Sequence, residues 1–188
     1  MIALAIILGL TAALILYVIA TYNKFVSLSE RINESWSGIE VQMKLRYNLI
    51  PNLVETVKGY AKHEAGTFEN VTKARTEAMA NQGSPAEQAS SENVLSGALK
   101  SLFALSENYP ELKANESFLN LQDQLSDVED KIQSARRYYN GVVRDNNTKV
   151  GQFPSNLVAN GFHFIKAEFF ELSDDDDAAR KPVSVKFD

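Results

Sequence analysis

Residues 25–57 read FVSLSERINESWSGIEVQMKLRYNLIPNLVETV, and the spacing of their apolar side chains decides the fold. Successive apolar positions lie alternately three and four residues apart, which is typical of the seam of a coiled coil or helical bundle. The same spacing continues to position 75. The seam positions are Phe25, Leu28, Ile32, Trp36, Ile39, Met43, Arg46, Ile50, Leu53, Val57, Tyr60, Glu64, Phe68, Val71 and Arg75. This pattern predicts an all-α fold, an elongated antiparallel bundle of long helices.

Pro51 interrupts the seam, because a proline inside a helix lacks the N–H donor and clashes with the preceding turn. Apolar positions on both sides of Pro51 nevertheless keep one phase, which a chain reversal would have no reason to preserve. We therefore predict one long helix that is kinked at Pro51, and the alternative is a four-helix bundle that reverses there. In a continuous helix the carbonyl of Tyr47 is left for water or a side chain, and Asn48 and Asn52 lie close enough to organise such a site.

Capping signals mark the next helix after a polar connector. Ser84 and Glu87 match a capping box with a proline at the first helical position, which predicts a helix over residues 85–107. Pro110 is expected to end this helix, since the residue before a proline disfavours the helical conformation.

Asn115 is the predicted cap of the last long helix, and Pro154 is expected to stop it. Its inward stripe consists of Phe118, Leu121, Leu125, Val128, Ile132, Ala135, Tyr139, Val142 and Asn146. Beyond it we expect a short helix that Gly161 breaks, then a Phe-rich segment that docks on the bundle or on another subunit. Residues 181–187 (KPVSVKF) alternate like a short strand, and the aspartates at 174–177 are interpreted as a solvated acidic tail.

The first twenty residues, MIALAIILGLTAALILYVIA, contain no charged side chain. As a helix this stretch is about 30 Å long, which matches the hydrocarbon core of a bilayer. A cleaved signal peptide is the competing interpretation, but the basic n-region is missing. The sequence therefore predicts a transmembrane anchor over residues 1–22, a helical bundle over 23–160, and an extended C-terminal segment over 161–188.

Two features of the anchor bear on its orientation and contacts. Lys24 and Arg31 follow the span closely, so the positive-inside rule places the C-terminal domain in the cytoplasm. Ala5, Gly9 and Ala13 lie on one helical face, and such small residues let two helices approach closely in lipid. This stripe favours self-association of the anchor.

The composition argues against several classes of protein. The chain has no Cys, two His and a net charge of −5, which excludes disulfides and Cys-based zinc sites and argues against nucleic-acid binding. His63-Glu64 does not begin an HExxH zinc motif, since position 67 is Thr67. No P-loop or nucleophile elbow is present either. We therefore expect no catalytic activity, cofactor or metal.

Charged and polar residues occur at or beside inward positions of the predicted bundle. A lone buried charge is unfavourable, so these residues must find partners. The interpretation we favour is an interhelical polar network that fixes helix register, with Glu64 paired to Arg136, and the alternative is a polar groove for a partner segment. The predicted network consists of Arg46, Asn52, Tyr60, Glu64, Arg75, Arg136, Tyr139 and Asn140.

Five motifs occur in a specific order along the chain: RYNLIPNLV at 46–54, GYAKHE at 59–64, YPELK at 109–113, ARRYYN at 135–140 and FP at 153–154. Together with the N-terminal span and the closing PVSVKF, they resemble the LemA family. The resemblance implies a bacterial single-span membrane protein, with its N-terminus outside and a helical bundle inside. It implies no agreed activity, although some relatives belong to magnetosome membranes and others are encoded near membrane metalloproteases.

These observations predict a membrane-anchored helical scaffold of the bacterial inner membrane that contacts the lipid bilayer and associates with itself. One alternative is a membrane-remodelling or organising protein, which would need a basic or amphipathic surface facing the lipid. Another is an adaptor for a membrane metalloprotease, in which residues 183–187 add as a strand to the partner's sheet.

Overall fold

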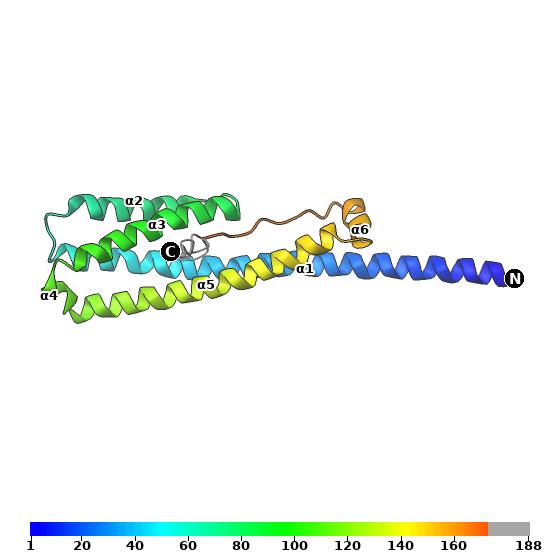
Figure 1. Ribbon diagram of the computed structural model, residues 1–188, viewed down its shortest axis with the longest axis horizontal. Helices are drawn as coiled ribbons and strands as arrows, with labels where there is room; N and C mark the ends of the chain where they lie inside the picture. The colour runs from blue at the N-terminus through cyan, green and yellow to red at the C-terminus, as the bar shows by residue number, and fades with distance from the viewer. Residues whose placement is uncertain (173–188) are drawn as a thin grey trace, which may run out of the picture. The chain divides into compact units, whose positions relative to one another are not determined.

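A computed structural model describes residues 1–172 of the chain, and these residues form six α-helices (Figure 1). The helices are α1 (Ile2–Lys58), α2 (Ala65–Ala80), α3 (Pro85–Ser106), α4 (Pro110–Lys113), α5 (Glu116–Gly151) and α6 (Ser155–Gly161). The described part contains no strand, so the all-α prediction is confirmed. The predicted acidic tail at 174–177 and the strand-like residues 181–187 lie outside the described residues.

Helix α1 contains 57 residues and includes Pro51 without interruption. The prediction of a continuous helix at this proline is therefore confirmed, and the alternative of a reversal there is wrong. A bend at Pro51 stays a prediction. The seam does not continue on the same helix to Arg75, however, because α1 ends at Lys58 and a turn over residues 59–64 leads into α2.

The turn after α1 could not be recognised in the sequence, because the apolar spacing keeps its phase across residues 59–64. Gly59 has a low helix propensity, and it directly follows the last helical residue. The backbone N–H of Tyr60 bonds to Val57 at 3.0 Å, and that of Glu64 bonds to Ala61 at 3.2 Å. These bonds span three residues instead of four, and they tighten the chain into a reversal.

The described chain forms two compact units, and α1 and α5 contribute residues to both of them. The first unit comprises Met1–Arg46 and Asp123–Phe169, and the second comprises Tyr47–Gln122 and the residues from Phe170. These units cut across the segments 1–22, 23–160 and 161–188, whose boundaries stay predictions.

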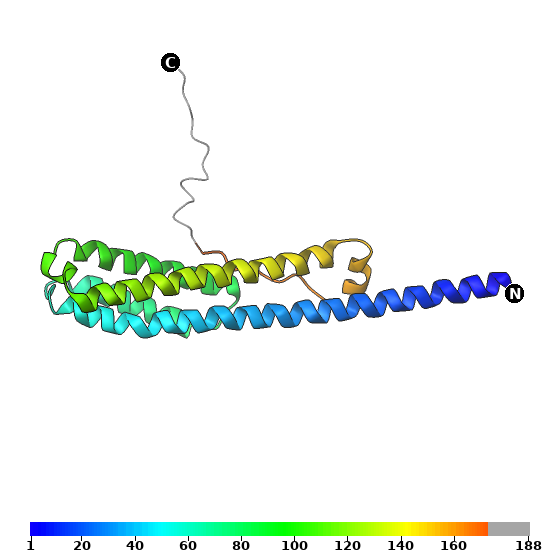
Figure 2. The ribbon, with the colours of Figure 1, turned by 90° about the horizontal axis from the view of Figure 1, so that it is seen from below.

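In the first unit, α5 runs antiparallel alongside α1, and α6 lies against α1 (Figures 1 and 2). The apolar faces of the two long helices form the core as the 3–4 spacing predicts. The buried core residues are Phe25, Leu28, Ile39, Met43, Leu125, Val128, Ile132, Tyr139, Val142 and Val143. By contrast, almost every residue before Thr21 is exposed, and Thr21 is the first buried residue of the helix.

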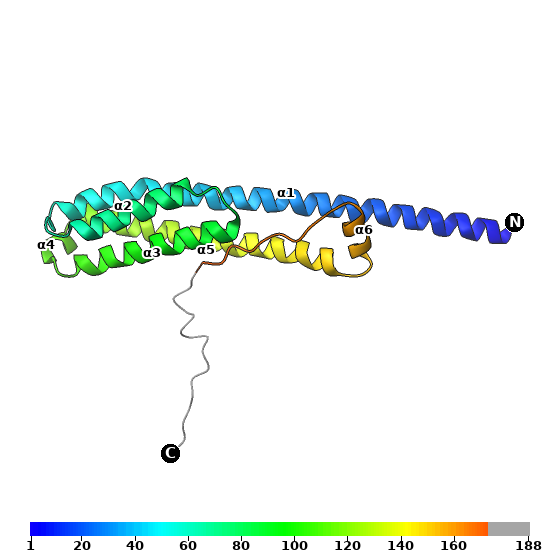
Figure 3. The same cartoon turned by 90° about the horizontal axis from the view of Figure 1, so that it is seen from above.

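In the second unit, α2 and α3 form an antiparallel pair, and their inner faces pack with the end of α1 and the start of α5 (Figure 3). The buried core residues include Leu53, Val57, Phe68, Val71, Leu95, Leu99, Leu102, Leu112 and Phe118. The predicted capping box is confirmed, because the Ser84 hydroxyl accepts from the Glu87 backbone and the Glu87 carboxylate accepts from the Ser84 N–H. A four-helix arrangement thus exists within this unit, although its reversal lies at 59–64.

The other predicted boundaries agree with the structure to within a few residues. Asn115 caps α5, because its side-chain oxygen accepts from the backbone N–H of Phe118 at 3.0 Å. Pro110 does not itself terminate α3, which ends at Ser106, and is instead the first residue of α4. Pro154 similarly lies after the end of α5 and is the N-cap residue of α6.

Candidate functional site

The polar side chains that the sequence singled out occupy several places in the structure, and the first lies at Pro51. Because Pro51 has no N–H, the carbonyl of Tyr47 receives no bond from within α1. The Nε–H of Arg75 on α2 donates to this carbonyl at 2.7 Å. The donor is therefore an arginine from the next helix, and not Asn48 or Asn52, which are both exposed. This bond connects α1 and α2 inside the second unit.

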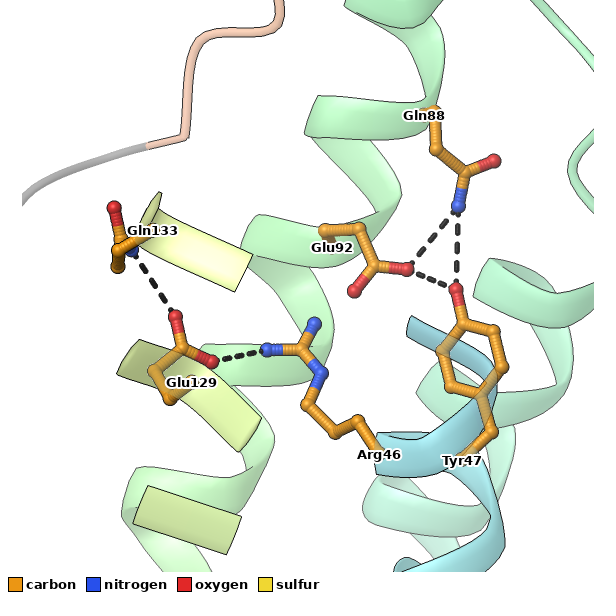
Figure 4. A network of polar contacts seen from close by, with 6 residues as sticks. All are labelled: Arg46, Tyr47, Gln88, Glu92, Glu129 and Gln133. Carbon is orange, nitrogen blue, oxygen red and sulfur yellow. Dashed lines mark hydrogen bonds and ion pairs between the residues drawn. The ribbon is translucent and has the colours of Figure 1, made fainter. Parts of the chain in front are cut away.

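A buried cluster surrounds the ring hydroxyl of Tyr47 (Figure 4). The hydroxyl donates to the carboxylate of Glu92 on α3. The side-chain amide of Gln88 lies 3.1 Å from the same carboxylate and 3.1 Å from the carbonyl of Ala78. Glu92 is only 1% exposed, so the acid is held among hydrogen-bond donors instead of water. This cluster joins α1, α2 and α3.

The sequence analysis missed Gln88 and Glu92. The signal was nevertheless present, because the 3–4 spacing of Leu95, Leu99 and Leu102 extends backwards to positions 92 and 88. Polar residues at inward positions of the third helix should have been treated in the same way as Arg46 and Arg75 on the first seam.

In the first unit, Arg46 forms an ion pair with Glu129 of α5 (Figure 4). Arg46 is 2% exposed, and its guanidinium lies 2.7 Å from the Glu129 carboxylate. The second carboxylate oxygen of Glu129 accepts from the Gln133 amide at 3.1 Å. The sequence identified Arg46 as an inward charge but did not identify its partner, which follows the inward residue Val128 on α5.

Three polar residues of α5 bind the extended chain that follows α6. The Tyr139 hydroxyl donates to the carbonyl of Glu168 at 2.9 Å. The Asn147 side chain forms two hydrogen bonds with the backbone of Ala167, at 2.8 and 2.9 Å. The Asn146 amide donates to the carbonyl of Ile165 at 3.2 Å. The Phe-rich segment therefore docks on its own chain. Burial raises the pKa of Tyr139 to about 12, because the ionised phenolate would lose its hydration.

Two of the other predicted network residues, Tyr60 and Glu64, have partners outside these clusters. The Tyr60 hydroxyl accepts a hydrogen bond from the Asn115 amide at 2.9 Å. Glu64 directly precedes α2, and its carboxylate accepts a hydrogen bond from the Tyr109 hydroxyl at 3.5 Å. Asn52 is exposed, whereas Arg136 and Asn140 are half-buried on α5. The eight residues are thus distributed over both units, and the Glu64–Arg136 pair stays a prediction.

Residues Ala5, Gly9 and Ala13 all lie on the exposed part of α1. A side chain added at Gly9 would meet no other atom within 4 Å. Nothing in the described part of the chain covers this stripe. It is therefore free to contact lipid or another helix.

A metal centre would require several oxygen or nitrogen ligands in one place. Within residues 1–172 no group of three or more His, Asp or Glu side chains is positioned to hold a metal ion. His63, which begins the incomplete zinc motif, is exposed in the turn between α1 and α2. The polar clusters described above connect helices, and their geometry suits structural hydrogen bonding.

The model of the LemA family matches residues 35–187 of the chain, which include both polar clusters and most of the bundle. The chain belongs to the LemA family. Of the motifs that carry the resemblance, RYNLIPNLV supplies Arg46, Tyr47 and Pro51 to the clusters described above.

Several relatives are similar to most of the chain. Magnetosome protein MamQ 2 and its counterpart MamQ 1 of Paramagnetospirillum magneticum are each 28% identical over 184 residues, covering 85% of this chain and 68% of theirs. Protein LemA of Metamycoplasma hominis is 27% identical over 155 residues, covering 81% of this chain and 69% of its own. Among the residues that the structure describes, one apolar helix, near the N-terminus, is long enough to cross a membrane. The family and this helix indicate a membrane-associated protein with a single N-terminal anchor.

Proposed function

We propose that the protein is a single-span membrane scaffold without catalytic activity, which presents a helical bundle at the membrane and associates with itself. The observation that carries the proposal is the continuity of α1. Nearly all of residues 2–20 are exposed and apolar, and the same helix enters the packed core at Thr21 and Phe25 without a loop. A helix without a linker couples the orientation of the first unit to the orientation of the anchor, as a scaffold requires.

Charges after the span support a cytoplasmic location for the bundle. Lys24 and Arg31 lie within the first turns after the apolar stretch. Positive residues are retained on the cytoplasmic side of bacterial membranes. We therefore place the protein in the inner membrane, with its N-terminus outside.

The exposed stripe on the anchor supports self-association. Close approach of two helices in lipid needs small residues at the contact, because packing and not the hydrophobic effect drives the association. Ala5, Gly9 and Ala13 meet this requirement, and no other part of the described chain covers them. The stripe is therefore the expected contact between two copies.

A second candidate function is membrane organisation through such assemblies. It is supported by relatives named as magnetosome proteins in Paramagnetospirillum magneticum and Magnetospirillum gryphiswaldense. A scaffold that merely holds a bundle and one that shapes a membrane would share the same anchor contacts. Imaging of vesicles that contain the purified protein distinguishes them, because only the organising function predicts a change in vesicle shape.

The test of self-association is energy transfer between two differently labelled populations of the full chain in lipid vesicles. Gly9→Leu adds a side chain on the stripe, and Thr11→Leu enlarges one on the opposite side of the helix as a control. We expect transfer in the wild type and in Thr11→Leu, with a large loss in Gly9→Leu. Equal transfer in the two variants would show that the stripe is not the contact, and background transfer in the wild type would refute self-association.

A further inference from the structure

The chain around α6 lies beside the point where the anchor enters the bundle. The ring of Tyr22 contacts the rings of Phe162 and Phe164, with centroids 5.0 and 5.5 Å apart. Phe164 also stacks on Phe25 at 4.8 Å. Tyr22 follows the last residue of the apolar span by only two positions, which is about 3 Å along a helix. This part of the C-terminal chain is therefore held at the level where the span ends.

Residues 152–165, which we call the α6 apex, expose an unusual number of large apolar side chains. The exposed fractions are 75% for Phe153, 62% for Leu157, 52% for Phe162 and 80% for Ile165. On the surface of a soluble protein, exposed apolar residues are usually scattered singly. Four between residues 153 and 165, at the end of a membrane span, indicate contact with an apolar environment.

One face of α6 packs against the rest of the first unit, so the side chains on its other face are held outward. Val158 and Ala159 of α6 are buried. The Ser155 hydroxyl lies 2.6 Å from the carbonyl of Lys149 and 2.9 Å from that of Gln152. The packed face of α6 thus fixes the opposite face, which carries Leu157, in an exposed position.

The charges of this region suit an anionic surface. From residue 149 to 167 the charged side chains are Lys149 and Lys166, and the first carboxylate after them is the exposed Glu168. Lys166 and His163 are exposed. Basic residues beside exposed apolar ones are typical of elements that lie in the interface of a membrane with negatively charged lipids.

We propose that the α6 apex is a second membrane-contacting element, which inserts Phe153, Leu157 and Phe162 into the headgroup region beside the anchor. The occupant is the lipid bilayer, because the apex is bound to Tyr22 at the end of the span. Interfacial elements of this kind penetrate about 5–10 Å, which exposed side chains on a short helix can reach. Contact at two points would fix the tilt and rotation of the bundle on the membrane. This inference rests on the proposed anchor.

The test uses the absence of cysteine in the chain, which allows single labelling sites in the full-length protein. A nitroxide label is attached to Leu157→Cys at the apex, to Ile15→Cys in the span, and to Val41→Cys as an exposed control on α1. The protein is placed in lipid nanodiscs of phosphatidylcholine and phosphatidylglycerol. The collision rates with oxygen, which concentrates in lipid, and with a water-soluble nickel complex are then compared.

We expect the oxygen-to-nickel ratio at Leu157 to exceed the ratio at Val41 several-fold and to approach the ratio at Ile15. If Leu157 behaves like Val41 while Ile15 lies in lipid, the apex proposal is wrong and the anchor stands. If all three labels lie in water, the proposed anchor fails as well. A label at Leu157 that is shielded from both reagents would also overturn the proposal, because another protein surface would then cover the apex.

Discussion

Replacement of Arg75 by methionine tests whether this arginine compensates for the proline inside α1. Methionine keeps an unbranched stem and a high helix propensity, so the substitution removes the guanidinium with little effect on α2 itself. The carbonyl of Tyr47 then loses the donor that lies 2.7 Å away, and Pro51 cannot replace it. A hydrogen bond to a charged donor contributes about 1.5–3 kcal/mol. Since Arg75 is half-buried, we expect a loss of about 1–2 kcal/mol.

The decisive comparison is the same substitution in a Pro51→Ala background. Alanine restores an N–H that can donate to the carbonyl of Tyr47, so Arg75→Met should then be milder by about 1 kcal/mol, the net value of an ordinary hydrogen bond. Pro51→Ala alone should raise stability by about 1–3 kcal/mol, because proline is unfavourable inside a helix. The free energy of unfolding is measured by urea titration of the full chain in mild detergent, followed by circular dichroism.

Lys73→Met is the matched control for this cycle. Lys73 lies on the exposed face of α2, and its ammonium is 4.0 Å from Glu77. Such surface changes usually alter stability by less than about 0.5 kcal/mol. If Arg75→Met loses equal stability in both backgrounds, the arginine does not act through the proline gap. A Pro51→Ala protein that is less stable than the wild type would equally contradict the reasoning.

Three further predictions concern other parts of the chain. The pKa of Tyr139 is about 12 in the folded chain and about 10 in an unfolded chain, so its contribution to stability is full below a pH of about 10 and is lost as the pH rises towards 12. In Tyr139→Phe the free energy of unfolding should therefore lack this part of its decrease with pH. An unchanged dependence on pH would contradict the assignment. Arg46→Ala should lower the free energy of unfolding by about 2–3 kcal/mol. This is less than for a fully buried ion pair, because Glu129 is partly exposed. Lys44 is exposed, so Lys44→Ala should change the free energy of unfolding little in the same titration. A reporter enzyme that works only in the cytoplasm should be active when fused after Asp188, whereas activity of an exported reporter at that position would reverse the proposed orientation.

Periodicity predicted the long helices well, because packing of two long helices imposes one repeating pattern on the sequence. The course of α1 across Pro51 followed from the apolar phase that is preserved on both sides of it, and the cap at Asn115 followed from a local rule. The turn at residues 59–64 did not, because its seam positions fit a continuous helix equally well. Tyr60 is substantially exposed in the structure, so the seam spacing there does not reflect burial in a helix.

The polar contacts were only partly predictable for the same reason. Inward phase identified Arg46 and Arg75 as residues that need partners, and the structure gives each of them one. Which residue becomes the partner depends on the chain reversal and on helix register, neither of which the spacing contains. Arg75 could not be assigned to the carbonyl of Tyr47 while both were placed on one helix. Glu92 was missed because its own helix was examined only for apolar residues.

The central claim, that the chain is a self-associating membrane scaffold, is tested most directly by native mass spectrometry of the full-length protein released from its own membrane in mild detergent. The account predicts assemblies whose masses are whole-number multiples of the chain mass, with bound lipid and without a stoichiometric second protein. A single chain at all concentrations, or a fixed complex with a membrane protease, would contradict it.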